Sequence, residues 1–450
     1  MPSQKTLAHF SPGRIILYSV FFTILLGTLA LALPIARTKP VAFIDLIFTA
    51  TSSACVTGFF TVPLEHFSHF GHTIIMILMQ IGGIGLITLT IFLLSLFVDL
   101  GFAHQVMAGQ LMELESWKNV KKIIIFITAA TFSLELIGAA AIFPLLYASY
   151  PIQEALYLSL FHSISSFCNA GISLFDHSLA PFTSNYFMLS ITSILMVIGG
   201  LGFITWREIM YYCMSLRKKK RYSFSLHSKI ILYGTLSIIV AGSIVIFLLE
   251  YHHALAQLSL TERIANALFQ ATSFRSGGFT TIAIASMSLP ALFACLPLMF
   301  IGAAPGSTGS GVKIPTITLF IASIRATILD RETVELKGRS IANDQIYRAI
   351  AIVALAICWI GITTLLLLIT ESSTAFFPIL LESVSAFGNI GISLGVTKTL
   401  SAAGKAIIVI SMIIGRIGAL TLVMALRQIT LRRAPEPKGF TYPEERIMLS

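Results

Sequence analysis

Charged residues are scarce in this 450-residue chain. Only 11% of its residues are Asp, Glu, Lys or Arg and 56% are hydrophobic, whereas a soluble domain carries about 25% charged residues. Such a chain cannot cover itself with a water-facing surface, which excludes a soluble globular protein. Its longer apolar segments reach the roughly 20 residues that a helix needs to cross a bilayer. We therefore expect a protein embedded in lipid.

Cysteine is scarce as well, and its five copies follow no pairing pattern. None belongs to a CxxC motif, and most lie in apolar surroundings. We expect buried thiols, without a disulfide framework or a metal site. The five are Cys55, Cys168, Cys213, Cys295 and Cys358.

Clusters of His, Asp and Glu at membrane depth are missing, and a membrane enzyme would need them. The histidines concentrate in loops and near segment ends, with His162 the main exception. We interpret His162 as a packed, hydrogen-bonded residue rather than a metal ligand. No enzymatic activity is expected. No polar loop is long enough to form a domain, so regulation by a ligand would need a separate protein.

Eight apolar segments are long enough to be transmembrane helices. Between the two members of each successive pair lies a shorter apolar segment, of the length typical of a re-entrant or interfacial helix. The predicted spans cover residues 15–33, 73–98, 123–149, 186–205, 230–249, 289–324, 349–370 and 406–426. The predicted re-entrant segments cover residues 41–54, 152–167, 261–274 and 375–387.

Basic residues gather on one side of this topology. Of the 30 Lys and Arg, 22 lie in the N-terminus, in the segments 117–122, 207–229 and 325–348, and in the C-terminal tail. The positive-inside rule then predicts a multi-pass protein of the cell inner (plasma) membrane with both termini in the cytoplasm. The basic run 217–221 is expected to dock a partner or anionic lipid, not nucleic acid.

The unit of span, re-entrant segment, glycine and span occurs four times. Each re-entrant segment is followed by a glycine and a large apolar residue, and small or hydroxyl residues precede the glycine. The four glycines, Gly58, Gly171, Gly278 and Gly391, are 113, 107 and 113 residues apart, and a regular internal period is a strong signal of repeats. The predicted repeats are 1–100, 101–222, 223–340 (with a broken second span) and 341–430, followed by a cytoplasmic tail, 431–450.

This pattern predicts an all-α membrane protein in which four membrane-pore-membrane repeats, with re-entrant pore helices, surround a central ion pathway. Non-helical backbone is tolerated at membrane depth only where it is buried in protein or lines a cavity. Four helix C-termini can aim their partial negative charge at one point, and four strands can present carbonyls to a dehydrated cation. The alternative is that the glycines only allow helices to pack or turn. The predicted ion-binding residues are Val56, Thr57, Gly58, Asn169, Ala170, Gly171, Ser276, Gly277, Gly278, Asn389, Ile390 and Gly391.

The pattern resembles the Trk/Ktr/HKT superfamily of potassium transporters. The resemblance covers about residues 15–430, and eight spans are most similar to the bacterial KtrB-type membrane subunit. It implies a K+ pathway with one glycine of each loop in a selectivity filter, and no cofactor bound by this chain. In plant relatives a serine at the first-loop position goes with Na+ preference, so Gly58 favours K+. The residues before the four glycines differ, which leaves open the strictness of selectivity and a Na+ requirement.

The resemblance also implies partners. It predicts a homodimer of this chain and a ring of cytoplasmic nucleotide-binding regulatory subunits of the KtrA/TrkA type. The basic loops and the tail after Arg427 are candidate contacts for that ring.

The sixth predicted span contains an unusual segment, residues 301–315. Eleven of these fifteen residues are Gly, Ala, Ser, Thr or Pro, and a helix loses about 1 kcal/mol per interior Gly and about 3 kcal/mol per Pro relative to Ala. We expect it to unwind in mid-membrane, as transport paths often do. It is not a nucleotide-binding P-loop, because Val312 and Lys313 follow Gly311 and no strand precedes it. The resemblance implies an intramembrane gate there, formed by Gly302, Pro305, Gly306, Ser307, Thr308, Gly309, Ser310, Gly311 and Lys313, with Arg416.

Arg416 falls in the middle of the eighth predicted span, where an arginine costs at least about 2.5 kcal/mol on insertion scales. We hypothesise that it contacts carbonyls of the broken segment and holds a gate closed by hydrogen bonds and cation repulsion. The alternative is a structural pairing with Glu135 or a loop carbonyl, and Lys313 is ambiguous in the same way. Arg275 precedes the third filter glycine and is expected to point away from the ions and tie the loop down.

Two other functions stay open. One is a secondary transporter of another small solute, although its usual signature is a pair of inverted repeats with two broken helices. The other is a less selective transporter of Na+ and K+.

Overall fold

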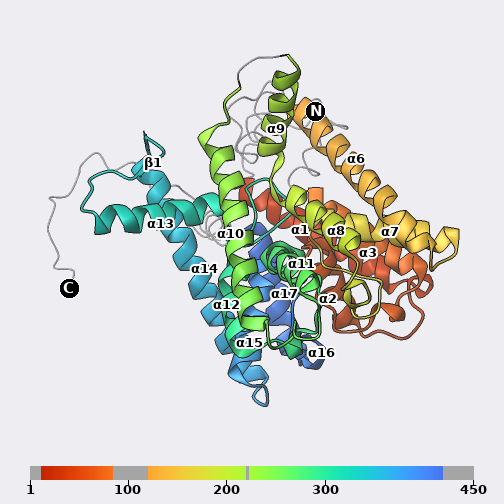
Figure 1. Cartoon of the computed structure of the whole chain (residues 1–450). Helices are drawn as coiled ribbons and strands as arrows, with labels where there is room; N and C mark the ends of the chain where they lie inside the picture. The colour runs from red at the N-terminus through yellow and green to blue at the C-terminus, as the bar shows by residue number, and fades with distance from the viewer. Residues whose placement is uncertain (1–11, 85–119, 219–221, 419–450) are drawn as a thin grey trace, which may run out of the picture.

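The computed structural model describes residues 12–84, 120–218 and 222–418, and these residues form a bundle of helices (Figure 1). A helix lies in each predicted span, and parts of the spans 73–98 and 406–426 lie outside the described residues. These helices are α1 (Pro12–Ala32), α3 (His69–Ile84), α6 (Val120–Tyr147), α8 (Tyr186–Gly200), α10 (Leu226–Glu250), α12 (Leu289–Phe300), α14 (Asn343–Thr370) and α17 (Ala402–Ile417).

Among the described residues, three helices are long and apolar enough to cross a bilayer unaided: Ile125–Tyr147, Leu226–Glu250 and Asn343–Thr370. Helix α10 (Leu226–Glu250) exposes large apolar side chains, as expected for a helix surrounded by lipid. Its residues Tyr233, Leu236, Ile244 and Leu248 are all more than half exposed. A continuous stripe of large apolar side chains on a helix surface is stable in hydrocarbon and unfavourable in water. The number of spans, eight, stays a prediction.

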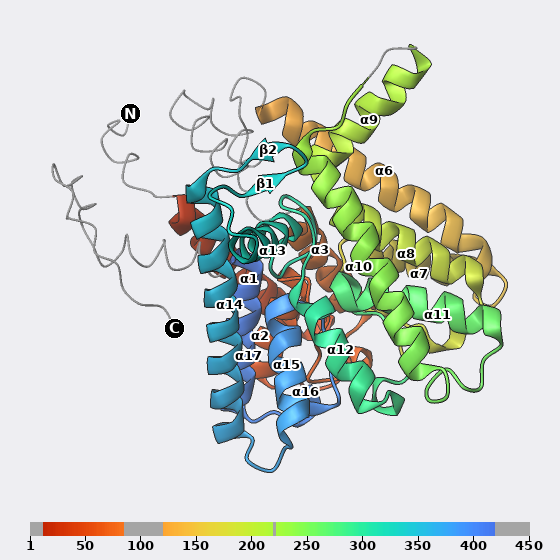
Figure 2. The same cartoon turned by 60° about the vertical axis from the view of Figure 1, so that its left-hand side comes forward.

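Shorter helices fill all four predicted re-entrant segments, which confirms that these segments are helical. Each ends inside the molecule, where its last residues are buried. Figure 2 shows α15 beside α12, α14 and α17. The four are α2 (Phe43–Ala54), α7 (Ile152–Phe167), α11 (Leu260–Thr272) and α15 (Phe376–Gly388).

A capping box marks the start of α11. Ser259 accepts a hydrogen bond from the backbone N–H of Glu262, whose carboxylate accepts one from the backbone N–H of Ser259 (2.9 Å). This capping box satisfies N–H groups that the first turn of a helix leaves without partners.

The sixth predicted span is broken, as its composition predicts. Helix α12 ends at Phe300, and α13 (Ile314–Ile328) begins after a non-helical loop. Figure 1 shows α13 turned sideways against α14, next to the short hairpin of β1 (Glu335–Leu336) and β2 (Arg339–Ser340).

The predicted span over residues 186–205 is not one continuous helix. Helix α8 ends at Gly200, and α9 (Phe203–Arg217) leaves it at an angle of 107°. Gly202 at this break has a φ of +78°, a conformation that a glycine adopts readily and other residues rarely do. Gly202 therefore allows the chain to turn sharply between α8 and α9.

The prediction of five buried thiols is wrong for two of them. All five cysteines lie in described residues and are free, but Cys213 on α9 and Cys358 on α14 are exposed. An apolar thiol on the outer face of a membrane helix can be covered by lipid, so it does not need burial within the protein.

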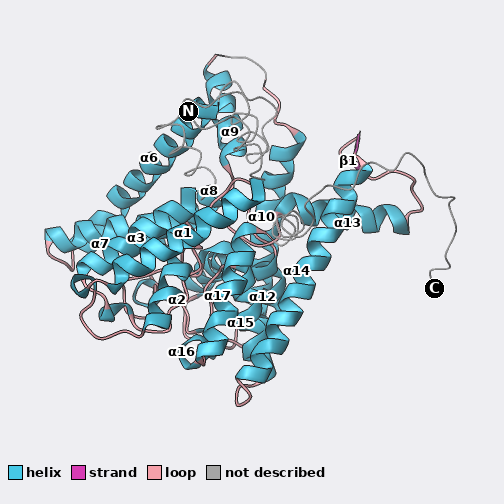
Figure 3. Ribbon diagram, turned by 180° about the vertical axis from the view of Figure 1, so that it is seen from behind, coloured by secondary structure: helices cyan, strands magenta, loops and turns pink. Residues whose placement is uncertain are grey.

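The helices of the N-terminal part, α1, α3 and α7, lie together on one side, and α12, α15 and α17 lie on the other (Figure 3). An ion pair joins the two sides. Lys405 near the start of α17 lies 2.6 Å from a carboxylate oxygen of Asp45 in the first turn of α2, and Thr61 donates to the same oxygen (2.7 Å). The Lys405 and Asp45 side chains are only 16% and 10% exposed.

We expect Lys405→Met to lower the free energy of unfolding by about 1–3 kcal/mol, because the largely buried Asp45 carboxylate would lose its cationic partner. Thermal unfolding in detergent checks this. Lys398→Met is the matched control, because the side chain of Lys398 is exposed. Equal melting temperatures for the two variants would show that the ion pair contributes nothing.

Candidate functional site

Four glycines meet beyond the ends of the short helices. Their φ angles lie between +66° and +91°, and a Cβ added to any of them would collide with the backbone of another of the four segments. The collisions follow chain order and close on themselves. They join Gly58 to the carbonyl oxygen of Ala170, Gly171 to that of Gly277, Gly278 to that of Ile390, and Gly391 to that of Thr57. We call these four glycines the glycine ring.

The ring explains why glycine occurs at all four positions. A side chain would need both a strained left-handed backbone and space that a neighbouring carbonyl already occupies. Four backbone segments that are far apart in the sequence therefore approach one another closely, with their carbonyl groups at the contacts.

In three of the four segments, the residue two positions before the ring glycine has a left-handed backbone conformation. Val56, Asn169 and Asn389 have φ angles of 59°, 59° and 52°, the left-handed region that Asn tolerates far better than a β-branched residue. In the third segment, Ser276 instead belongs to a π-helical turn, Ser273–Gly277. The shared conformation shows that Val56 occupies the position of the asparagines, although the residue type differs.

Serines at the ends of the short helices hold these segments. Ser52 accepts a hydrogen bond from the backbone N–H of Gly58 (3.1 Å), and Ser165 accepts one from Ile172 (3.0 Å). Ser385 does the same for Ile392 (2.9 Å), and Ser273 donates to the carbonyl of Phe279 (2.5 Å). The hydroxyl residues seen before each glycine in the sequence therefore fix the backbone that follows the helix.

Glycines of the longer helices lie behind the ring. A Cβ at Gly82, Gly199 or Gly415 would collide with the carbonyl oxygen of Ala54, Phe167 or Phe387, respectively. Each of these carbonyls lies four residues before a ring glycine. Helices α3, α8 and α17 thus pack directly on the backbone that supports the ring.

The loop between α12 and α13, residues 301–313, contains all the predicted gate residues except Arg416. Its ends are joined by hydrogen bonds from Gly302 N to Val312 O (2.9 Å) and from Val312 N to Phe300 O (3.1 Å). The Lys313 ammonium donates to the carbonyl of Gly309 (2.6 Å). Although the segment is not helical, several of its backbone polar groups therefore have hydrogen-bond partners.

The 301–313 loop also donates hydrogen bonds to the last carbonyl groups of α8. The backbone N–H of Thr308 donates to Gly199 O (3.2 Å), and that of Ala304 donates to Gly200 O (3.0 Å). The last carbonyls of a helix have no partner within it, so the loop stabilises α8 where the chain bends.

Arg416 connects α17 to this loop. Its Nη1 donates to Thr308 O (2.5 Å) and to Ser310 Oγ (3.1 Å), and its Nη2 donates to the carbonyl oxygen of Gly82 on α3. The remainder of the predicted span, residues 419–426, lies outside the described residues, so the position of Arg416 in the middle of that span stays a prediction. Helix α17 ends at Ile417 and Gly418 has a φ of +91°, so the guanidinium lies at a helix C-terminus, where the helix dipole favours a cation.

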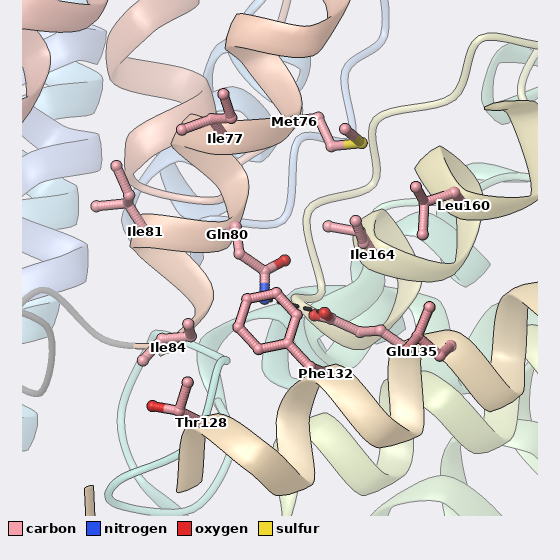
Figure 4. Close-up of a pocket in the computed structure, with 11 residues that line it drawn as sticks. Met76, Ile77, Gln80, Ile81, Ile84, Thr128, Phe132, Glu135, Leu160 and Ile164 are labelled. Atoms are coloured by element: carbon pink, nitrogen blue, oxygen red, sulfur yellow. Dashed lines mark hydrogen bonds between the residues drawn. The ribbon is translucent and has the colours of Figure 1, made fainter. Parts of the chain in front are cut away.

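Glu135 has a different partner. Its carboxylate accepts a hydrogen bond from Gln80 (2.9 Å) and lies 3.7 Å from the Cys168 thiol. Gln80 and Glu135 line a cavity of about 600 Å³ between α3, α6 and α7. Figure 4 shows the hydrogen bond between them. The rest of the wall is mostly apolar, with Phe132 and Leu160 among its residues.

Two other predicted side chains are fully buried. His162 lies 3.1 Å from the Thr192 hydroxyl and packs against Phe279, which confirms a packed, hydrogen-bonded residue. The guanidinium of Arg275 lies behind the third ring segment, next to Gly200. Its Nε and Nη2 have no hydrogen-bond partner, so these two atoms do not tie the loop down as predicted. In the described part of the chain, no cluster of three His, Cys, Asp or Glu could hold a metal ion.

Comparisons with known proteins agree on one family. The model of the TrkH family, described as cation transport protein, matches residues 12–433. The chain is 34% identical to the potassium/sodium uptake protein NtpJ of Enterococcus hirae over 455 residues, which cover 99% of each chain. It is 33% identical to the Ktr system potassium uptake protein B of Bacillus subtilis over 438 residues, 96% of each chain.

A solved structure shares the fold. The potassium transporter TrkH from Vibrio parahaemolyticus matches with a TM-score of 0.76 at 20% sequence identity, over 94% of this chain and 86% of that one.

Proposed function

The chain belongs to the TrkH family of cation transport proteins, and we propose that it is the K+-translocating membrane subunit of a Ktr/Trk-type uptake system. It is a helical, multi-pass membrane protein. The observation that carries the proposal is the glycine ring, in which four backbone segments meet at the ends of four short helices. The names of the relatives from E. hirae and B. subtilis, which refer to potassium or potassium/sodium uptake, support it.

In this proposal the ring is the selectivity filter. Carbonyl oxygens of its four segments replace the water around a K+ ion. Helices α2, α7, α11 and α15 all end just before the ring, so the partial negative charge at their C-termini stabilises a cation there. The serine hydrogen bonds behind the ring hold the oxygens at a fixed spacing.

The 301–313 loop and Arg416 form the gate. The hydrogen bonds from Arg416 to Thr308 and Ser310 hold the loop in place, and its positive charge repels a passing cation. When these bonds break, the small residues of the loop allow it to move past neighbouring helices.

The remaining features of the system are part of the same proposal. Both termini and the basic loops lie in the cytoplasm, following the positive-inside rule. The chain forms a homodimer and binds a cytoplasmic ring of nucleotide-binding subunits. It has no enzymatic activity and binds no cofactor. A less selective transporter of Na+ and K+ is the second candidate, favoured by the unequal residues that precede the four glycines.

Uptake by cells that lack their own K+ transporters tests the proposal. We expect the chain to restore growth on limiting K+ and to drive accumulation of Rb+, with excess Na+ competing weakly. Strong competition by Na+ would support the second candidate. A chain that reaches the membrane but gives neither growth nor Rb+ accumulation would contradict both.

A further inference from the structure

We propose that Asn169 and Asn389 couple the 301–313 loop to the glycine ring, so that hydroxyl groups of the loop set the preference of the ring for K+ over Na+. The inference rests on the proposed function of the ring. It assigns to the loop a role in selectivity in addition to gating.

The two asparagines occupy equivalent places. Each lies two residues before a ring glycine, has a left-handed backbone and is 2% exposed. They belong to the second and fourth segments, which are not neighbours in the ring. The side-chain amide of each asparagine forms hydrogen bonds both to the 301–313 loop and to another ring segment.

One end of each amide contacts the loop. Asn169 Nδ2 donates to Thr308 Oγ1 (2.6 Å), and Asn389 Nδ2 donates to Ser310 Oγ (3.0 Å). Gly199 makes room for the first bond, since a Cβ there would lie 3.0 Å from both Asn169 Nδ2 and Thr308 Oγ1.

The other end of each amide contacts another ring segment. Asn169 Oδ1 accepts a hydrogen bond from Ser276 Oγ (3.1 Å) in the third segment, and Asn389 Oδ1 accepts one from Thr57 Oγ1 (3.0 Å) in the first. The two amides therefore join all four segments in pairs and fix both pairs to the loop. An asparagine suits this role because its side chain carries donors and an acceptor at opposite atoms.

Arg416 donates hydrogen bonds to the same two loop residues, Thr308 and Ser310. Ser310 Oγ accepts from both Arg416 Nη1 and Asn389 Nδ2, while Thr308 accepts from Arg416 at its carbonyl and from Asn169 at its hydroxyl. A loop that moves away from Arg416 therefore also leaves both amides. Asn169 Nδ2 also donates to Met196 O (3.2 Å) and Phe167 O (3.4 Å) and would keep these acceptors, whereas Asn389 Nδ2 would lose Ser310 Oγ. A buried amide that loses its acceptor is unfavourable, so Asn389 above all would shift to a new partner and release the spacing of the ring segments.

The test changes the loop and leaves every ring residue intact. We expect the double variant Thr308→Val, Ser310→Ala to lower the ratio of K+ to Na+ uptake in proteoliposomes by roughly tenfold, because it removes two hydrogen bonds that hold the ring. Ser243→Ala is the matched control, because Ser243 lies in α10, outside the ring and the gate, and donates within its own helix to Ile239 O (2.7 Å). It should keep the wild-type ratio. The variant Thr308→Ser, which keeps the hydroxyl, should also keep that ratio.

A loop that acts only as a gate predicts that uptake of both ions changes by the same factor in the double variant, and an unchanged ratio would overturn the inference. A cycle of Asn389→Ala, Ser310→Ala and their combination tests it again if the double loop variant does not reach the membrane. We expect Ser310→Ala to have little further effect on the ratio once Asn389 is replaced, and fully additive effects would overturn the coupling. Absence of K+ uptake by the wild-type protein would instead refute the proposed function.

Discussion

Replacing Arg416 with glutamine is expected to raise K+ flux by at least roughly tenfold. Arg416 donates to Thr308 O, Ser310 Oγ and Gly82 O. A hydrogen bond from a charged group contributes about 1.5–3 kcal/mol, and about 1.4 kcal/mol corresponds to a tenfold change in an equilibrium. Loss of these bonds favours the displaced loop, and loss of the charge also removes a repulsion that every ion would meet. Rb+ flux into proteoliposomes, normalised to the amount of protein, measures the effect.

Two variants make this result specific. Arg325→Gln removes a cation from the exposed last turn of α13 and should leave flux unchanged. Arg416→Lys keeps the charge but loses the planar fork of donors, so its flux should lie between those of the wild type and Arg416→Gln. Unchanged or lower flux in Arg416→Gln at normal expression would assign Arg416 a structural role only.

Gly58→Ser is expected to reduce K+ transport and the preference for K+ over Na+, each by roughly tenfold, since a side chain in a left-handed backbone costs about 1–2 kcal/mol. Gly58 has a φ of +91°, and its new Cβ would overlap the carbonyl oxygen of Ala170. That carbonyl belongs to the next segment of the ring, so the substitution disturbs the spacing of two segments together. Uptake of Rb+ and of Na+ under the same conditions gives both values.

Gly361→Ser is the matched control for Gly58→Ser. Gly361 lies in α14, and a Cβ added there meets no atom within 4 Å. It should transport K+ at the wild-type rate with the wild-type preference. If Gly58→Ser behaved in the same way, the ring would not be the selective part of the pathway.

The elements around the ring could be predicted from the sequence because their signals are local. Apolar segment length marks α2, α7, α11 and α15, and the small residues of 301–313 mark the break after α12. The common period of the four glycines indicates that they belong together. These features depend on the composition of short segments and on a repeat period that can be read directly from the sequence.

The contacts between distant segments could not be predicted. The approach of Gly391 to Thr57 and the pairing of Lys405 with Asp45 join the last part of the chain to the first, and no local pattern specifies such pairs. The role of the asparagines was also missed. Its only signal in the sequence is that the same residue type, at 169 and 389, stands two places before a ring glycine.

Cation flux through the wild-type protein in proteoliposomes, under imposed K+ and Na+ gradients, tests the central claim most directly. The carbonyl oxygens of the glycine ring are proposed to replace the hydration shell of K+. An imposed K+ gradient should therefore drive rapid Rb+ uptake, and an equal Na+ gradient should drive little cation uptake. Equal flux of Na+ and K+ would contradict a K+-selective ring, and absence of flux of either ion in correctly folded protein would contradict the ion pathway itself.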